Sequence, residues 1–228
     1  KSRLQRAKND KLDALLIAAF TASLLEMPAL PDARLDGLAG HLTYIEQFEE
    51  RIATLKTMLE ACRDPRIRRL QTADIKKLQA AHKAEVQLLV KMIASHAEMN
   101  RKFRLIVSIK GVGVRSALAF VVRLPEIGSL SREEAAALAG LAPFDNDSGT
   151  RNRTRRVAGG RKRLRKSLFM AAFAAAQWNK DLKTFYTRLR ENGKPHLVAT
   201  IATARKLVIL ANAIVAKNRP WTESKMPN

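Results

Sequence analysis

The fold prediction starts from Leu105–Val122, which reads LIVSIKGVGVRSALAFVV. The apolar end of one helix comes first, Gly111-Val112-Gly113 forms a turn, and a new helix begins at about Arg115. This order is typical of a helix-hairpin-helix, whose glycines permit positive φ and bring backbone N–H groups close to a phosphate. The alternative is an ordinary helix–helix turn in which the glycines serve only steric needs.

Two long helices are predicted before this stretch, at about 32–63 and 65–103, with Asp64-Pro65 between them. The first has the three-four spacing of a coiled-coil seam at Leu42, Ile45, Phe48, Ile52, Leu55 and Leu59. The second runs through Ile67, Leu70, Leu78, Leu88, Met92 and Met99. An antiparallel hairpin of this kind is too thin to bury its seams alone, so we expect it to pack on a second copy.

Helices are also predicted on both sides of these elements. A short one covers about residues 8–25, with an apolar stripe at Leu12, Leu15, Leu16 and Ala19. Downstream, a capping box at Ser131–Glu134 opens a short helix, and three more helices cover about 161–177, the stretch ending at Asn192-Gly193, and 196–219. Only the arm at about 152–157 has a β-pattern. We therefore predict a mainly α fold, with a long antiparallel coiled-coil hairpin followed by a compact helical domain.

Charge is the strongest compositional signal in the 228 residues, which hold 42 Lys and Arg against 21 Asp and Glu. Residues 141–228 contain 19 of these basic residues and 5 of the acidic ones. This concentration predicts a polyanionic partner that binds the C-terminal part. The single cysteine, Cys62, indicates a reducing compartment, and no apolar run is long and unbroken enough to predict a membrane span.

The densest basic run surrounds a serine. Residues 144–156 read FDNDSGTRNRTRR, and from Arg151 to Lys166 there is no acidic residue. Arginine forks and a helix N-terminus both suit phosphate, so the run is predicted to bind nucleic acid: Arg151, Arg153, Arg155, Arg156, Arg161, Lys162, Arg163, Arg165 and Lys166. Ser148 would be a nucleophile only if a base or metal activated it; a loop serine bonded to its own backbone is the alternative.

Two carboxylates near the N-terminus are candidate metal ligands. Asp10 and Asp13 are three residues apart on the first predicted helix, so they share a face that could hold Mg²⁺. The alternative is that they only complement the helix dipole. The four histidines match no metal spacing.

An ordered series of motifs resembles the IS110 (IS-one-ten) insertion-sequence transposases, a family of bridge-RNA-guided DNA recombinases. The motifs are AKNDKLDA (7–14), SIKGVGVRSALAF (108–120), GLAP (140–143), DSGT (147–150) and LRKSLFMAAFAAA (164–176). The resemblance covers essentially the whole chain. It implies that residues 1–31 end a RuvC-like DEDD domain, 32–103 form a coiled-coil dimerisation region, and 104–228 form a transposase domain.

Roles follow from the same resemblance. Asp10 and Asp13 match the last two DEDD carboxylates, which hold Mg²⁺ in the full-length protein, and Ser148 matches the nucleophilic serine. No residue of this chain matches the first Asp and the Glu, so we expect a fragment that is inactive alone. The implied partners are DNA, a guide (bridge) RNA and further copies of the chain, as a dimer or tetramer, in the bacterial cytoplasm at the nucleoid, with no membrane.

The implied reaction is attack by Ser148 on a DNA phosphodiester, followed by strand exchange and religation. The arginine arm and the turn at Gly111 and Gly113 would grip the backbone, while guide pairing would choose the sequence. Two other hypotheses stay open at this point. One is a non-catalytic helix-hairpin-helix module that binds nucleic acid, and the other is a coiled-coil scaffold whose charge only improves solubility.

Overall fold

The computed structural model describes residues 10–22, 33–144, 156–157 and 159–223. The chain divides into two compact units, Lys1–Leu35 and Asp36–Asn228. The described residues form nine helices and one two-stranded ladder, so the prediction of a mainly α fold is confirmed.

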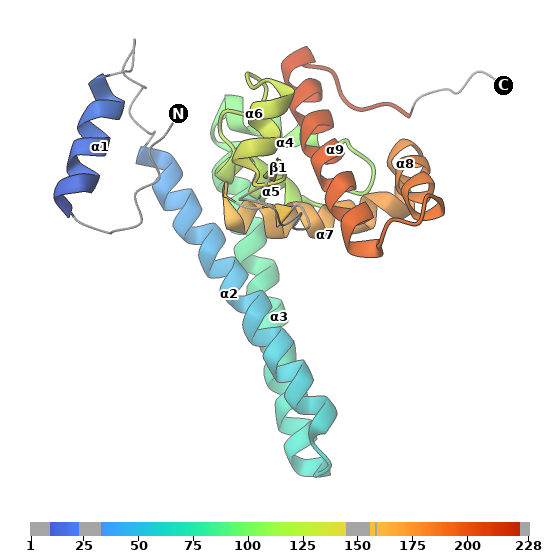
Figure 1. Cartoon of the computed structure of the whole chain (residues 1–228). Coiled ribbons are helices and arrows are strands. Elements are labelled where there is room, and N and C mark those ends of the chain that lie inside the picture. Colours follow the sequence, from blue (N-terminus) through green and yellow to red (C-terminus); the bar gives the residue numbers. More distant parts are fainter. Residues whose placement is uncertain (1–9, 23–32, 145–155, 158, 224–228) are drawn as a thin grey trace. The chain divides into compact units, whose positions relative to one another are not determined.

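The described element of the first unit is α1 (Asp10–Ala22), shown in blue in Figure 1. Its apolar residues Leu15, Leu16 and Ile17 are all exposed. Leu15, Leu16 and Ala19 of the predicted apolar stripe are thus exposed, and the side chain of Leu12 lies outside those that the structure describes.

Two long helices follow, α2 (Ala33–Ala61), which belongs to the second unit from Asp36 onward, and α3 (Pro65–Ala94). They run antiparallel and project from the helical body (Figure 1). Asp64 starts α3, because its carboxylate accepts hydrogen bonds from the N–H groups of Arg66 and Ile67 at 2.8 and 3.0 Å. Pro65 follows in the first turn, where no N–H is required. Two side-chain pairs cross the hairpin, His41–Glu85 at 2.7 Å and His82–Glu49 at 3.3 Å.

The seam predicted on α2 is buried at its N-terminal part, whereas the stripe predicted on α3 is mostly exposed. Leu42, Ile45 and Phe48 of α2 are buried, as the predicted seam requires. The buried residues of α3 are Ile75, Leu89 and Ile93, whereas Ile67, Leu70, Leu88 and Met92 are exposed. Four residues of the predicted stripe on α3 are thus left exposed in the single chain, and a different face of α3 is buried. Apolar neighbours such as Leu88 and Leu89 offer two possible faces, and only packing against α2 and the body selects one.

The predicted end of the third helix is also wrong. The helix ends at Ala94 rather than near Phe103, and α4 (Ala97–Val107) begins after a break at Ser95-His96. The Ser95 hydroxyl donates to the carbonyl oxygen of Met92 at 2.7 Å. Such local bonding competes with the helical ladder, and His96 adopts an extended conformation.

The helical body follows. It contains α4, α5 (Val114–Arg123), α6 (Arg132–Leu138), α7 (Lys162–Trp178), α8 (Lys180–Glu191) and α9 (His196–Lys217). The capping box at the start of α6 is confirmed: Ser131 Oγ accepts from the N–H of Glu134, and the Glu134 carboxylate accepts from the N–H of Ser131. The Glu134 pKa is lowered by these bonds to Ser131.

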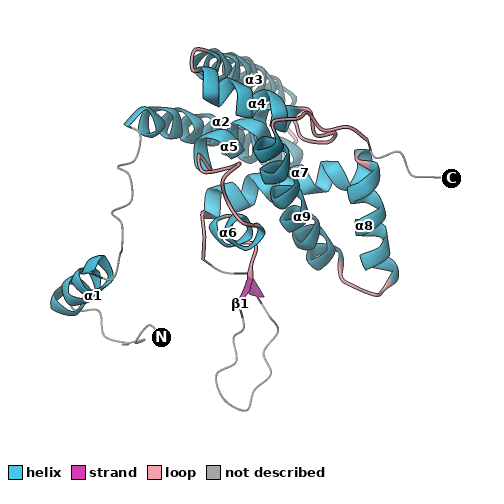
Figure 2. Cartoon of the chain, turned by 90° about the horizontal axis from the view of Figure 1, so that it is seen from above, coloured by secondary structure: helices cyan, strands magenta, loops and turns pink. Residues whose placement is uncertain are grey.

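The central helix of the body is α9, which packs against α4, α6, α7 and α8 (Figure 2). Among the described helices it alone is long and apolar enough to span a membrane by composition, but 56% of that stretch is buried inside the protein, as in a core helix. Its buried Asn212 accepts from the N–H of Gly128 at 2.7 Å and donates to the carbonyl of Leu130 at 2.6 Å. These bonds fix the α5–α6 connection on α9.

Candidate nucleic-acid interface

The start of α7 is the most basic part of the described chain. Arg161 is its N-cap residue, Lys162, Arg163, Arg165 and Lys166 follow, and the first turn has no acidic residue. Cations at a helix N-terminus oppose the macrodipole. This start is therefore unfavourable unless anions approach it from other elements or from a ligand.

Arg161 and Arg165 direct their donors to the protein itself. Arg161 binds the Glu126 carboxylate through two parallel hydrogen bonds of 2.6 and 2.7 Å and donates to the carbonyl of Arg123. The hydrogen bonds from Arg161 lower the pKa of Glu126. Arg165 donates to the carbonyls of Gly140 and Gly159 at 3.1 and 3.0 Å. Both arginines thus fasten the ends of the segment that leads to and from Ser148.

Arg163 belongs to a second group, centred on one buried carboxylate of α2. Glu46 is 8% exposed. It accepts hydrogen bonds from Arg163 at 2.6 Å, from Arg123 at 2.8 Å and from Arg115 at 3.1 Å. Burial is the main cause of a lowered pKa at Arg123, to which the neighbouring arginines add. We call this cluster the Glu46 hub; it joins α2 to α5 and α7.

The hub is incompletely neutralised. Arg115 also binds Glu49, with 2.7 Å between its Nε and Oε1. Arg115 Nη1 and Arg123 Nε are nevertheless buried without a hydrogen-bond partner among the described residues. Three guanidinium groups face Glu46, and Glu49 supplies the second carboxylate, so positive charge is in excess here.

Lys162 and Lys166 lie on the exposed side of α7, as predicted. Lys166 contacts Glu50 at 3.2 Å, but both side chains are largely exposed, and such a pair contributes at most about 1 kcal/mol. Lys162 has no ion-pair partner among the residues that the structure describes. A phosphate can therefore approach both lysines at little cost.

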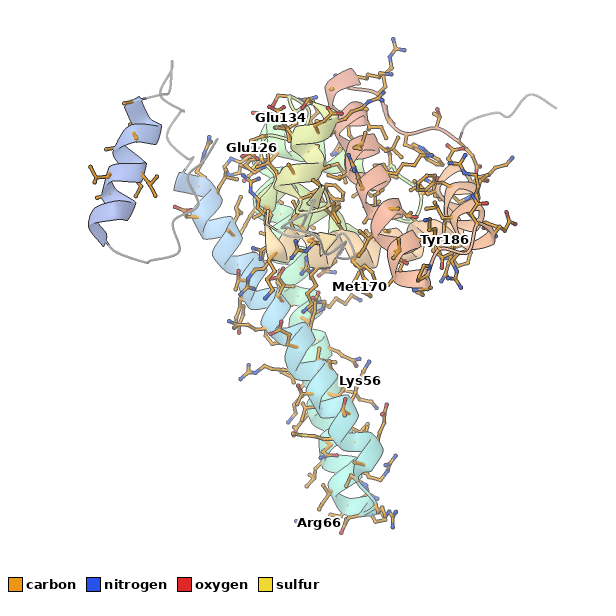
Figure 3. All side chains as sticks on the ribbon, viewed as in Figure 1. Lys56, Arg66, Glu126, Glu134, Met170 and Tyr186 are labelled. Carbon is orange, nitrogen blue, oxygen red and sulfur yellow. The ribbon has the colours of Figure 1, made fainter. Side chains whose placement is uncertain are left out.

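These side chains line a cleft of about 900 Å³ between α2, α5, α7 and the start of α9. Figure 3 shows Met170, one of its lining residues, on the side of α7 from which the hairpin projects. The polar lining comes from α2, α5 and α7, and the apolar lining comes mainly from α7 and α9. The full set is Glu46, Glu49, Glu50, Arg115, Ser116, Leu141, Lys162, Arg163, Arg165, Lys166, Ser167, Phe169, Met170, Leu197 and Ile201.

A short ladder borders the Ser148 segment. β1 (Pro143–Phe144) pairs antiparallel with β2 (Arg156–Val157), with Phe144 opposite Arg156. Gly160 has a φ of +61° and packs so tightly that a Cβ there would lie 2.3 Å from the Gly140 nitrogen. The two ends of the segment are thus held together beside the start of α7. Ser148, Arg151, Arg153 and Arg155 lie outside the described residues, as does the side chain of Arg156.

The two glycines of the turn before α5 differ. Gly111 has a φ of +92°, and a Cβ there would lie 2.5 Å from the Cα of Ala175, so this glycine lets the turn pack on α7. Gly113 is exposed, begins α5 and has open space around it. Gly111 therefore meets the steric need raised as the alternative, and the space open to a phosphate lies at Gly113.

Asp10 and Asp13 belong to the first turn of α1, and their side chains are not among those that the structure describes. Within the described residues there is no group of three or more His, Cys, Asp or Glu that could hold a metal ion. The predicted metal ligands are thus placed by the backbone of α1 alone.

Sequence reasoning missed two parts of this interface. The first is the Glu46 hub, whose Glu46–Arg163 partners lie 117 residues apart. No local pattern pairs such residues. The second is the apolar floor, formed by Phe169, Met170, Leu197 and Ile201. A signal for it existed, because Phe169 and Met170 fall on the face of α7 opposite Leu164 and Leu168.

Residues 103–187 match the model of the transposase IS116/IS110/IS902 family. The matched range includes α5, the Ser148 segment, α7 and most of the cleft.

Curated relatives are similar over longer or shorter stretches. The "Insertion element IS110 uncharacterized 43.6 kDa protein" of Streptomyces coelicolor is 33% identical over 122 residues, which cover 53% of this chain and 30% of that protein. The "Pilin gene-inverting protein" of Moraxella bovis is 27% identical over 223 residues, 95% of this chain and 68% of that protein. The "Insertion element IS900 uncharacterized 42 kDa protein" of Mycobacterium paratuberculosis is 29% identical over 124 residues, 50% of this chain and 30% of that protein. The chain thus spans under a third of the two insertion-element proteins.

Proposed function

We propose that this chain, whose residues 103–187 match the model of the transposase IS116/IS110/IS902 family, is a member of that family and cuts and rejoins DNA as part of an insertion-sequence recombinase. The observation that carries this proposal is the family match itself, since residues 103–187 contain Ser148 and all the basic residues that line the cleft. The relative named for pilin gene inversion fits a protein that exchanges strands rather than one that only cuts them.

In the proposed reaction, Ser148 Oγ attacks a DNA phosphorus. The new Oγ–P bond forms as the P–O3′ bond breaks. One DNA end therefore stays joined to the serine through its 5′-phosphate, and the other end leaves with a free 3′-hydroxyl. The ester keeps the bond energy, and attack by another 3′-hydroxyl rejoins the strands and frees the serine. The described residues on the two sides of the Ser148 segment support this role, because they are paired with each other and lie beside the start of α7, whose basic residues line the cleft.

Mg²⁺ is the metal that fits the proposal. Asp10 and Asp13 occupy positions of α1 that share a face, and hard carboxylate oxygens are the ligands Mg²⁺ prefers. The ion, when bound with the other carboxylates of a DEDD set, supplies charge stabilisation at a phosphate. In this proposal α1 is the last helix of a RuvC-like domain, and its exposed Leu15, Leu16 and Ile17 pack on the remainder.

The proposed partners are DNA, a guide RNA that selects the sequence, and further copies of the chain. Exposed Leu70, Leu88 and Met92 on α3 support a dimer through the hairpin, because a second hairpin would cover them. A DNA-acting protein of this family would work in the bacterial cytoplasm at the nucleoid.

The test is to trap the covalent intermediate on the full-length protein. End-labelled substrate DNA should become attached to protein through Ser148, as mapped by mass spectrometry, and Ser148→Ala should abolish both the adduct and recombination while retaining DNA binding. Ser167→Ala is the matched control, since this cleft hydroxyl bonds the carbonyl of Arg163. An adduct on Ser116 or Ser167 would refute the assignment of the nucleophile.

The Ser148→Ala variant of the full-length protein also tests the alternative of a non-catalytic module that binds nucleic acid. If the chain is only a nucleic-acid-binding module, recombination survives Ser148→Ala. The 228-residue chain alone should bind nucleic acid without cutting it, because no residue in it matches the first Asp and the Glu of the DEDD set; Mg²⁺-dependent nicking by this chain would contradict the proposed composite site.

A further inference from the structure

The exposed face of α7 changes character along its length. Lys162 and Lys166 stand at the start, and one turn later the same side carries Met170 and Phe173, which are 60% and 44% exposed. Phe169, half-buried beside them, lines the cleft. A cationic surface therefore passes directly into an apolar one on a single helix.

The first turns of α9 extend the apolar part. Leu197 and Val198 are exposed, and Leu197 and Ile201 line the cleft opposite Met170. His196 lies between two rings, with centroids 6.0 Å from both Phe173 and Tyr186. Exposed apolar side chains gathered beside a cleft indicate a binding surface.

Charge selects the kind of occupant. Each carboxylate of the cleft, Glu46, Glu49 and Glu50, already has a cationic partner, and the hub retains excess positive charge. An apolar protein surface would cover Met170 and Leu197 but leave Lys162 without a counter-charge. An unpaired nucleotide supplies both parts, because its base offers an apolar face and its phosphate a negative charge.

Duplex DNA does not fit the apolar part, since its base faces are stacked inside the helix. A segment with splayed bases does, and recognition of unstacked bases by apolar and aromatic side chains is common among proteins that bind single strands. Such binding does not read sequence, so it is compatible with a guide that does.

We propose that the cleft between α7 and the start of α9 binds unpaired nucleobases, with backbone phosphates on Lys162 and Lys166 and base faces on Phe169 and Met170. The inference rests on the proposed function, because exchange of strands requires base pairs to open. It adds a site for the opened bases that is separate from the serine chemistry.

The test compares three fluorescent probes by anisotropy on the 228-residue chain. They are a single strand of about 12 nucleotides, the same strand with abasic sites at its centre, and a matched duplex. The abasic strand keeps every phosphate and lacks the central bases. The intact strand should bind about tenfold more tightly than the abasic strand, as expected for loss of base stacking.

Two variants assign the difference to the cleft. Phe169→Leu keeps an apolar side chain but removes the aromatic face, and Met170→Ala truncates an exposed side chain without touching the core. Each should lower the preference for the intact strand to less than threefold and leave duplex affinity unchanged within about twofold. Trp178→Ala is the control, because Trp178 is exposed at the far end of α7 outside the cleft.

The outcomes separate this inference from the proposed function. Equal binding of intact and abasic strands, with good duplex affinity, overturns the inference alone. Failure to bind any probe counts against both. If Met170→Ala instead changes the oligomeric state in light scattering and leaves all three affinities unchanged, the surface binds protein and the inference is wrong.

Discussion

Arg161 and Glu126 join the start of α7 to the α5–α6 connection through two short parallel hydrogen bonds. Both side chains are more than a third exposed, so solvent screens part of their attraction. The bidentate geometry still holds the pKa of Glu126 below its usual value, mainly through the hydrogen bonds from Arg161.

This pair predicts a pH dependence of folding. The stability that Glu126 contributes is fully present above the usual glutamate pKa of about 4.3 and is lost as the pH falls through the lower folded value. Glu126→Gln should therefore be less stable than the parent at about pH 6, with the gap closing towards about pH 3, when urea midpoints are compared. Glu133→Gln, at an exposed position of α6, is the control. A gap that stays constant across this range would contradict the assigned cause.

At the residue scale, sequence predicts the positions of the basic residues but not their roles. The helical period places Arg161 and Arg165 on one side and Lys162 and Lys166 on another. Arg161 and Arg165 are turned away from phosphate because they bind Glu126 and the carbonyls of Gly140 and Gly159. These partners come close to the arginines only in the folded chain, so the sequence does not predict them. The same limit explains Gly111, whose positive φ could be predicted but whose contact with Ala175 could not.

At the element scale, the Glu46 hub connects the hairpin to the body. A carboxylate buried among three arginines is costly to remove, because the guanidinium groups are then left facing one another without a counter-charge. The exposed Glu50–Lys166 pair lies one helical turn further along α2, and its removal leaves no buried charge without a partner.

Glu46→Gln should lower the free energy of unfolding by about 3 kcal/mol, as expected when one partner of a buried ion cluster is lost. Glu50→Gln should change it by less than about 1 kcal/mol. Urea denaturation followed by circular dichroism measures both values. If the two substitutions lowered the free energy of unfolding equally, the Glu46 hub would not be what stabilises the packing of the hairpin on the body.

The sequence predicted where helices form better than it predicted which faces of the helices are in contact. Capping at Ser131 and the Asp64-Pro65 boundary were predictable because they depend on neighbours three residues away. The break at Ser95-His96 was missed because the apolar pattern continues past it into Met99. The buried face of α3 was missed because α3 also packs on α4, across a turn, and on α5, further along the chain. Such contacts leave no local pattern in the sequence of α3.

At the scale of the whole molecule, the excess of basic residues can attract nucleic acid in two ways. A net charge of +21 draws any polyanion towards the chain as a whole. A defined cleft instead neutralises particular phosphates and releases their counterions, so its residues set the slope of log affinity against log salt concentration. The coiled-coil scaffold hypothesis requires the first behaviour, and the proposed function requires the second.

The double substitution Lys162→Gln, Lys166→Gln distinguishes them. It should reduce the magnitude of the salt slope for duplex DNA by about 2, since each phosphate contact adds roughly 0.9. Lys56→Gln, Arg66→Gln is the matched control, because it removes the same charge from exposed positions on the hairpin, well away from Met170 and the cleft (Figure 3). Anisotropy titrations over a range of salt concentrations give both slopes. An equal reduction of the salt slope in the two variants would mean that net charge alone attracts the DNA. The cleft would then not be the binding surface.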